Sequence, residues 1–133
     1  MARILVVDDD ASARLAMKAI LETHGHSVVL AESGHRAVDA IEAYAFEVAI
    51  VDIFMPGMSG LETIKIFRRN APTLPILVIS GYARRNVADP AQDFFRAALD
   101  LGAVCCLAKP FKSAELLQSV ETCRAAAVHN KVA

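Results

Sequence analysis

The chain has 133 residues, 55% of them hydrophobic, and a formal net charge of −1. This length suits one domain with a single core, and the near-neutral charge, with scattered Lys and Arg residues, argues against nucleic-acid binding. The sequence has neither an apolar stretch of membrane-spanning length nor a signal-peptide pattern, so we expect a cytoplasmic protein that makes no contact with a membrane.

Five short apolar runs bounded by turn residues predict buried strands. They cover residues 2–7, 27–31, 46–52, 76–79 and 103–108. Each run is followed by a segment with apolar residues at helical spacing. These helices are expected near residue 12, after residues 33–34, over residues 60–69 and 92–101, and after a cap at Ser113. The cap of the first helix is Asp10, Ala11 or Ser12.

Strands that alternate with helices across short connections predict a parallel sheet with helices on both faces. Five such units suit the α/β, flavodoxin-like (βα)5 fold, a doubly wound parallel sheet with strand order 2-1-3-4-5. We expect this domain to occupy residues 1–125, followed by a short, fraying C-terminal tail at residues 126–133 and no output domain.

Polar side chains stand at the carboxyl ends of four predicted strands. Asp8 and Asp9 follow the first strand, Asp52 ends the third, Ser80 follows the fourth and Lys109 follows the fifth. Each alone is explained as a helix cap, a turn residue or a solvated lysine. In a doubly wound sheet, however, these strand ends share one edge, where ligands bind. We therefore expect the five side chains to converge.

Three neighbouring carboxylates repel one another, which raises their pKa values unless positive charge compensates. A divalent cation at Asp8, Asp9 and Asp52, together with the ammonium group of Lys109, would supply that charge. Oxygen ligands of this kind suit Mg²⁺ or Mn²⁺. Such a cation beside Lys109 and the Ser80 hydroxyl is typical of phosphoryl transfer, and Asp52 on the central strand is the predicted acceptor.

The sequence contains three cysteines, at Cys105, Cys106 and Cys123. Their odd number and their spacing fit neither a disulfide framework nor a zinc site. We expect free thiols, two of them adjacent in a predicted buried strand.

Four segments resemble the receiver domain of two-component response regulators, with single-domain chemotaxis regulators as the nearest type. They are ILVVDDD (residues 4–10), VDIFMPGMSGLE (51–62), ILVISG (76–81) and LAKPF (107–111). The resemblance implies a signalling protein rather than an enzyme. It further implies that Asp52 receives a phosphoryl group from a sensor histidine kinase or a histidine phosphotransfer protein, in a reaction that needs Mg²⁺.

The resemblance also implies roles for the residues around Asp52. Asp9, Asp52 and the backbone carbonyl of Phe54 would bind Mg²⁺ directly, whereas Asp8 would act mostly through a metal-bound water. In the same family the lysine corresponding to Lys109 contacts the phosphate, often across a cis bond to the following proline. The hydroxyl corresponding to Ser80 moves towards the phosphate.

Three features depart from the usual receiver pattern. Cys106 occupies the position where an aromatic residue often swings inward with the hydroxyl, and the chain is longer than usual at residues 84–91. The two positions that tune hydrolysis of the phosphoryl group hold aromatic residues, Phe54 and Tyr82. We expect these rings to hinder the attacking water, so that Phe54→Asn shortens the phosphorylated lifetime.

Two other functions compete with this interpretation. The run DDDAS at residues 8–12 is similar to the first motif of haloacid-dehalogenase-type phosphatases, but the later acidic pair of that family has no counterpart except Glu115 and Glu121 on a helix. An interaction module that is never phosphorylated is the second alternative. In the receiver interpretation, the output is docking of a downstream protein, expected on the fourth helix, fifth strand and fifth helix, or relay of the phosphoryl group.

Overall fold

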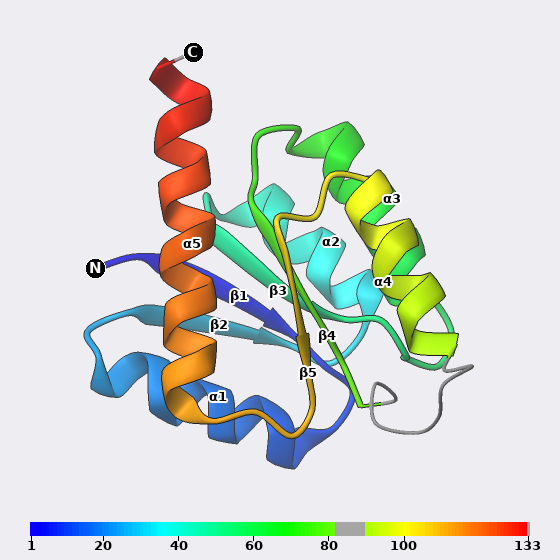
Figure 1. Cartoon of the computed structure of the whole chain (residues 1–133), viewed down its shortest axis with the longest axis horizontal. Helices are drawn as coiled ribbons and strands as arrows, with labels where there is room; N and C mark the ends of the chain where they lie inside the picture. Colours follow the sequence, from blue (N-terminus) through cyan, green and yellow to red (C-terminus); the bar gives the residue numbers. More distant parts are fainter. Residues whose placement is uncertain (82–89, 133) are drawn as a thin grey trace.

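A five-stranded parallel sheet forms the centre of the computed structural model, which describes residues 1–81 and 90–132 (Figure 1). The strands are β1 (Arg3–Val7), β2 (Ser27–Ala31), β3 (Val48–Asp52), β4 (Ile76–Ser80) and β5 (Cys105–Ala108). The helices are α1 (Ala11–Thr23), α2 (Gly34–Ala43), α3 (Gly60–Asn70), α4 (Pro90–Asp100) and α5 (Ser113–Val132). The strand order is β2-β1-β3-β4-β5, so the predicted fold class is confirmed.

Helices cover both faces of the sheet, α1 and α5 on one face and α2, α3 and α4 on the other (Figure 1). Successive side chains of a strand point to opposite faces of the sheet, so alternate residues belong to two separate cores. On β3, Ala49 and Val51 join the core under α2, α3 and α4, whereas Val48 and Ile50 join the core under α1 and α5. Burial on both faces explains why the central strands are continuous apolar runs.

Side-chain caps fix the starts of the helices. Asp10 is the cap of α1, since its side chain accepts a hydrogen bond from the Ser12 N–H at 2.9 Å. Ser59 and Glu62 form a capping box that starts α3. The expected cap at Ser113 is wrong, because Ser113 is already the first residue of α5. The residue before the helix is Lys112, whose backbone N–H donates to the Glu115 carboxylate.

The ends of some elements differ from the expected ones. β3 and β5 each begin two residues later than expected, because Val48 and Cys105 are the first residues of these strands to pair with a neighbour. The segment from residue 126, expected to be a short tail, is the last part of α5, which continues to Val132. The run of three alanines at residues 125–127 favours this continuation, because alanine has the highest helix propensity.

The loop expected after β4 lies mostly at residues 82–89, outside the described part of the chain, and so does Tyr82. α4 begins at Pro90, two residues before its expected start. The three cysteines carry free thiols, as predicted. Among the described residues, none of the helices combines the length and the hydropathy needed to cross a membrane.

Candidate functional site

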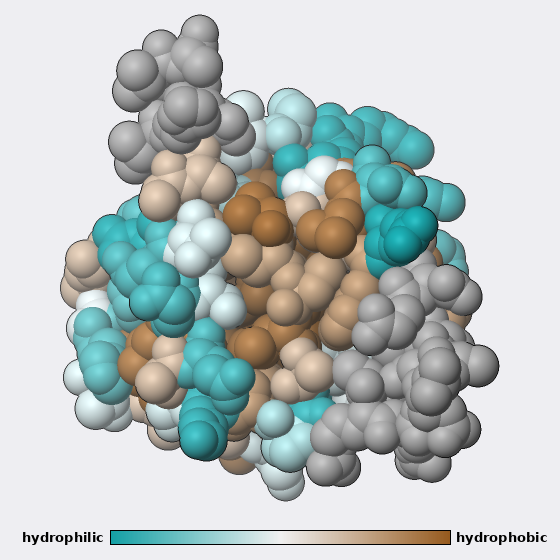
Figure 2. Space-filling view, in the orientation of Figure 1, coloured by the Kyte–Doolittle hydropathy of each residue, from teal (hydrophilic) through white to brown (hydrophobic). Residues whose placement is uncertain are grey.

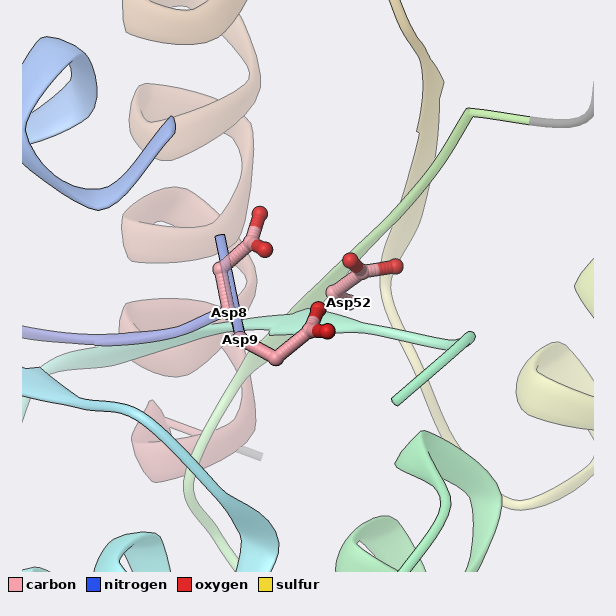
Figure 3. A group of neighbouring side chains, drawn as sticks. All are labelled: Asp8, Asp9 and Asp52. Carbon is pink, nitrogen blue, oxygen red and sulfur yellow. The ribbon is translucent and has the colours of Figure 1, made fainter. Parts of the chain in front are cut away.

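Three aspartates come together at the carboxyl edge of the sheet (Figure 3). Asp8 and Asp9 follow β1, and Asp52 ends the neighbouring strand β3, whose register sets Val51 beside Val7. One carboxylate oxygen from each aspartate lies within 4.8 Å of the other two. Asp8 and Asp52 are buried, whereas Asp9 is exposed, so the cluster opens to solvent on one side.

Lys109 places a positive charge on this acidic cluster. Its Nζ lies 2.8 Å from Oδ2 of Asp8 and 3.5 Å from Oδ2 of Asp52. The lysine directly follows β5, and its backbone N–H donates to the Ser80 carbonyl at 2.8 Å, which ties the end of β5 to the end of β4. The Lys109–Pro110 peptide bond is cis, as the family resemblance predicts.

The charges of the site act on one another because little water reaches them. Burial raises the pKa of the Asp52 carboxyl to about 7; the Lys109 ammonium opposes this increase, and the Asp8 carboxylate adds to it. Burial alone would lower the pKa of Lys109. Its hydrogen bond to Asp8 and its attraction to Asp52 outweigh that effect and raise the pKa. The ammonium group is therefore held in its charged form.

Asp8 is held by its neighbours on both carboxylate oxygens. Oδ1 accepts the Asp10 N–H at 3.0 Å, and Oδ2 accepts from Lys109. Its backbone carbonyl also accepts a hydrogen bond at 2.8 Å from the Arg14 guanidinium, a contact that was not expected from the sequence. Asp8 is thus a fixed buried charge, and the exposed Asp9 is the more available of the two for a ligand.

The remaining predicted site residues surround this centre. Ser80 ends β4 and is fully buried, and β4 pairs with β3 so that Ile79 lies beside Asp52. The Phe54 N–H donates to Oδ1 of Asp52 at 3.1 Å. Cys106 lies on β5, one strand beyond Ser80, and its thiol faces α4.

Gly60, the first residue of the helix expected over residues 60–69, also belongs to the site. Its N–H donates to the carbonyl of Ile53 at 2.9 Å, so the start of α3 lies directly against the backbone that follows Asp52. A Cβ at Gly60 would come within 2.5 Å of the Ile53 Cα. Only glycine allows this approach, and the Ser-Gly pair at a predicted helix start was the available signal.

The donor set fits a small, hard divalent cation. Three carboxylates from two adjacent strand ends offer oxygen ligands alone, and the solvent side of the cluster leaves room for water, as Mg²⁺ and Mn²⁺ require. One ammonium group does not balance three carboxylates, so a bound cation would also relieve their repulsion.

Residues 4–121 match the response regulator receiver domain family. The chain belongs to this family. It is 40% identical over 115 residues to response regulator MprA of Mycolicibacterium vanbaalenii, an alignment that covers 86% of this chain and 47% of that protein. The chain therefore spans about half the length of the curated relatives it matches.

Solved structures of receiver domains have the same fold. A CheY-like receiver domain protein from Methanospirillum hungatei is 27% identical with a TM-score of 0.87, over 98% of each chain. Chemotaxis protein CheY4 of Vibrio cholerae is 29% identical with a TM-score of 0.80, over 91% of this chain and 97% of that one. NtrX from Brucella abortus is 28% identical with a TM-score of 0.89, over 98% of this chain and 28% of that one.

Proposed function

We propose that Asp52 accepts a phosphoryl group from a phosphohistidine of a sensor histidine kinase or a histidine phosphotransfer protein. A carboxylate oxygen of Asp52 bonds to phosphorus while the phosphorus–nitrogen bond breaks, and the electron pair of that bond stays with the imidazole. The proposal is carried by one observation: Lys109 lies within 3.5 Å of two of three clustered carboxylates at a strand end.

The other residues of the site support this transfer. Asp9, Asp52 and the backbone carbonyl of Phe54 would hold Mg²⁺ or Mn²⁺, with Asp8 acting through a bound water. When bound, the cation neutralises charge on the phosphoryl oxygens. The Lys109 ammonium, already held near Asp52, would bind a further phosphoryl oxygen, and the Ser80 hydroxyl would bind another after it moves towards the phosphate.

Acetyl phosphate tests the proposal without the natural phosphodonor. With Mg²⁺ present, the chain should gain one phosphoryl group, and peptide mapping should place it on Asp52. Chelation by EDTA and the Asp52→Asn variant should each abolish labelling, whereas Asp39→Asn, at an exposed position on α2, should not. Labelling that persists in Asp52→Asn would contradict the proposal.

The same experiment separates the two alternative functions. A phosphatase of the haloacid-dehalogenase type would carry the label on Asp8, whose carboxylate is fully buried and lies 2.8 Å from the Lys109 ammonium, closer than that of Asp52. An interaction module would take up no label in the presence of Mg²⁺. Neither alternative has an observation in its favour.

The output is proposed to be docking of a downstream protein on α4, β5 and α5, or relay of the phosphoryl group. β5 is an edge strand of the sheet, all of its residues are half-buried, and apolar surface gathers over it between α5 and α4 (Figure 2). The phosphodonor would dock on a different surface, beside Lys109. An apolar hollow of about 460 Å³ adjoins Lys109, lined by α1 residues and by Phe111.

A further inference from the structure

Phe54 connects Asp52 to α4 through two contacts. Its backbone N–H donates to Oδ1 of Asp52 at 3.1 Å. Its ring packs edge-on against the ring of Phe94 on α4, with centroids 4.9 Å apart and an interplanar angle of 80°. One residue therefore touches both the proposed phosphoacceptor and a helix of the proposed docking face.

β5 holds the same part of α4 from another side. The Cys106 thiol donates to the backbone carbonyl of Phe95 at 3.8 Å. Cys106, Phe54, Phe94 and Phe95 are all half-buried and pack against one core, the core under α2, α3 and α4. A short thiol at Cys106 has no ring that could swing inward, whereas Phe54, which is bonded to Asp52, has a ring that packs on Phe94.

The ring pair has the energy needed to shift a conformational equilibrium. An edge-on aromatic contact contributes about 0.5–1.5 kcal/mol beyond its buried area, which corresponds to a roughly two- to tenfold change in the ratio of two states. Phosphorylation alters the charge and the hydrogen bonds at Asp52. The backbone N–H of Phe54 is one of the groups bonded to that carboxylate. The ring of Phe54 cannot move without changing its contact with Phe94.

We propose that the Phe54–Phe94 ring pair transmits the phosphorylation state of Asp52 to α4. This inference rests on the proposed phosphorylation of Asp52 and adds to it a route from the site to the docking face. Phe94 lies on α4 and contacts Phe54 ring to ring, whereas the metal ligand proposed at Phe54 is its backbone carbonyl. Phe94 is therefore a positioning residue, and its substitution should leave binding at Asp52 intact.

Beryllium fluoride with Mg²⁺, a stable mimic of the phosphoryl group, provides the test on the full chain. Amide chemical shifts of Asp9 and Lys109 report occupancy of the site, and those of residues 94–100 report the response of α4. In the wild type both groups of signals should move. In Phe94→Leu the site signals should still move, whereas the α4 shifts should fall by about twofold or more.

Further variants distinguish transmission from general packing. Phe54→Leu should reduce the α4 response as Phe94→Leu does, and the double variant should add little, since both remove the same contact. Phe94→Tyr keeps a ring and should retain the response. Phe46→Leu is the matched control, because it removes an edge-on ring contact with Tyr44, 6.2 Å between centroids, away from the site.

The outcomes separate the inference from the proposed function. An α4 response in Phe94→Leu equal to that of the wild type overturns the inference and leaves phosphorylation of Asp52 untouched. An equal loss in Phe46→Leu also overturns it, because the effect would then be one of general stability. Site signals of the wild type that do not move at saturating beryllium fluoride overturn the proposed function, and the inference with it.

Discussion

Gly60 has no room for a side chain, because it lies against the backbone of the proposed phosphoacceptor. A Cβ there would be 2.5 Å from the Ile53 Cα and would also meet the Asp52 carbonyl oxygen. These are backbone atoms that cannot rotate away, so Gly60→Ala must displace either α3 or Asp52. We expect a loss of about 1–3 kcal/mol in the free energy of unfolding, measured by urea titration, and slower labelling by acetyl phosphate.

Gly81→Ala is the matched control for this substitution. Its added Cβ would lie 3.8 Å from the Lys109 Cδ, an ordinary van der Waals contact, although Gly81 also follows a strand at the same edge. Stability and labelling in this variant should stay close to those of the wild type. Equal losses of stability and labelling in the two variants would contradict the prediction that the lack of space at Gly60 causes the effect.

Asp52 is a second residue whose surroundings have a measurable consequence, a dependence of stability on pH. Burial raises its pKa from 3.8 to about 7 in the folded protein. Between these pH values the folded state keeps a proton that the unfolded state has lost, so stability falls as pH rises through this interval. Without divalent cations, Asp52→Asn should therefore be more stable than the wild type at about pH 8, by on the order of 1 kcal/mol.

Chemical denaturation in EDTA across this pH range tests the prediction. The advantage of Asp52→Asn should shrink as the pH falls and reach its minimum below the unfolded-state pKa of 3.8, where the wild-type carboxyl is protonated in both states. Asp39→Asn, at an exposed position on α2, should follow the wild-type curve. A variant that is less stable than the wild type at every pH would show that the contact of Asp52 with Lys109 outweighs the cost of burying its charge.

Arg68 fastens one helix to the connection that follows it. From the last turn of α3 its guanidinium donates to the carbonyl of Pro72 at 2.7 Å and to the carbonyl of Leu74. Lysine cannot reproduce this forked geometry. Arg68→Lys should lower the free energy of unfolding by about 1–3 kcal/mol. Arg69→Lys, at the exposed neighbouring position, should have little effect, and thermal melts of the two variants and the wild type measure the difference.

Elements of this fold were predictable where local chemistry and tertiary structure agree. The strand that ends at Asp52 is a continuous apolar run followed by turn residues, and both signals hold in the structure. The Phe54–Phe94 contact was not predictable, because it depends on how α3 and α4 pack on the sheet. The same holds for the hydrogen bonds from Arg68 to the carbonyls of Pro72 and Leu74. The extent of α5 was missed because its last residues were expected to fray as chain termini do, despite their high helix propensity.

The clustering of the site's carboxylates was predictable from the sequence, but their burial and their contacts with Lys109 were not. Their positions at the ends of neighbouring strands follow from the topology alone, and the structure brings Asp8, Asp9 and Asp52 together. Which of them is buried, and which one Lys109 contacts most closely, depends on side-chain packing. For that reason the sequence could not distinguish the buried Asp8, held on both oxygens, from the exposed Asp9.

On the scale of the whole molecule, the site exists only when the sheet is formed. Asp8 and Asp9 come from the end of β1, Asp52 from the end of β3, and Lys109 reaches the cluster from beyond β5. An unfolded chain does not hold these groups together. A ligand of the cluster therefore binds the folded state and stabilises it by mass action.

This linkage predicts that Mg²⁺ raises the stability of the whole domain. At a concentration one hundred times its dissociation constant, a ligand of the folded state adds about 2.7 kcal/mol to the free energy of unfolding. The increase should be largely lost in Asp9→Asn and Asp52→Asn, and sodium chloride at equal ionic strength controls for screening of surface charge. Because a proton on Asp52 competes with the cation, the increase should also be larger at about pH 8 than at about pH 6. Urea titrations with and without EDTA measure it, and an equal increase in the wild type and in Asp52→Asn would place the bound Mg²⁺ elsewhere on the surface.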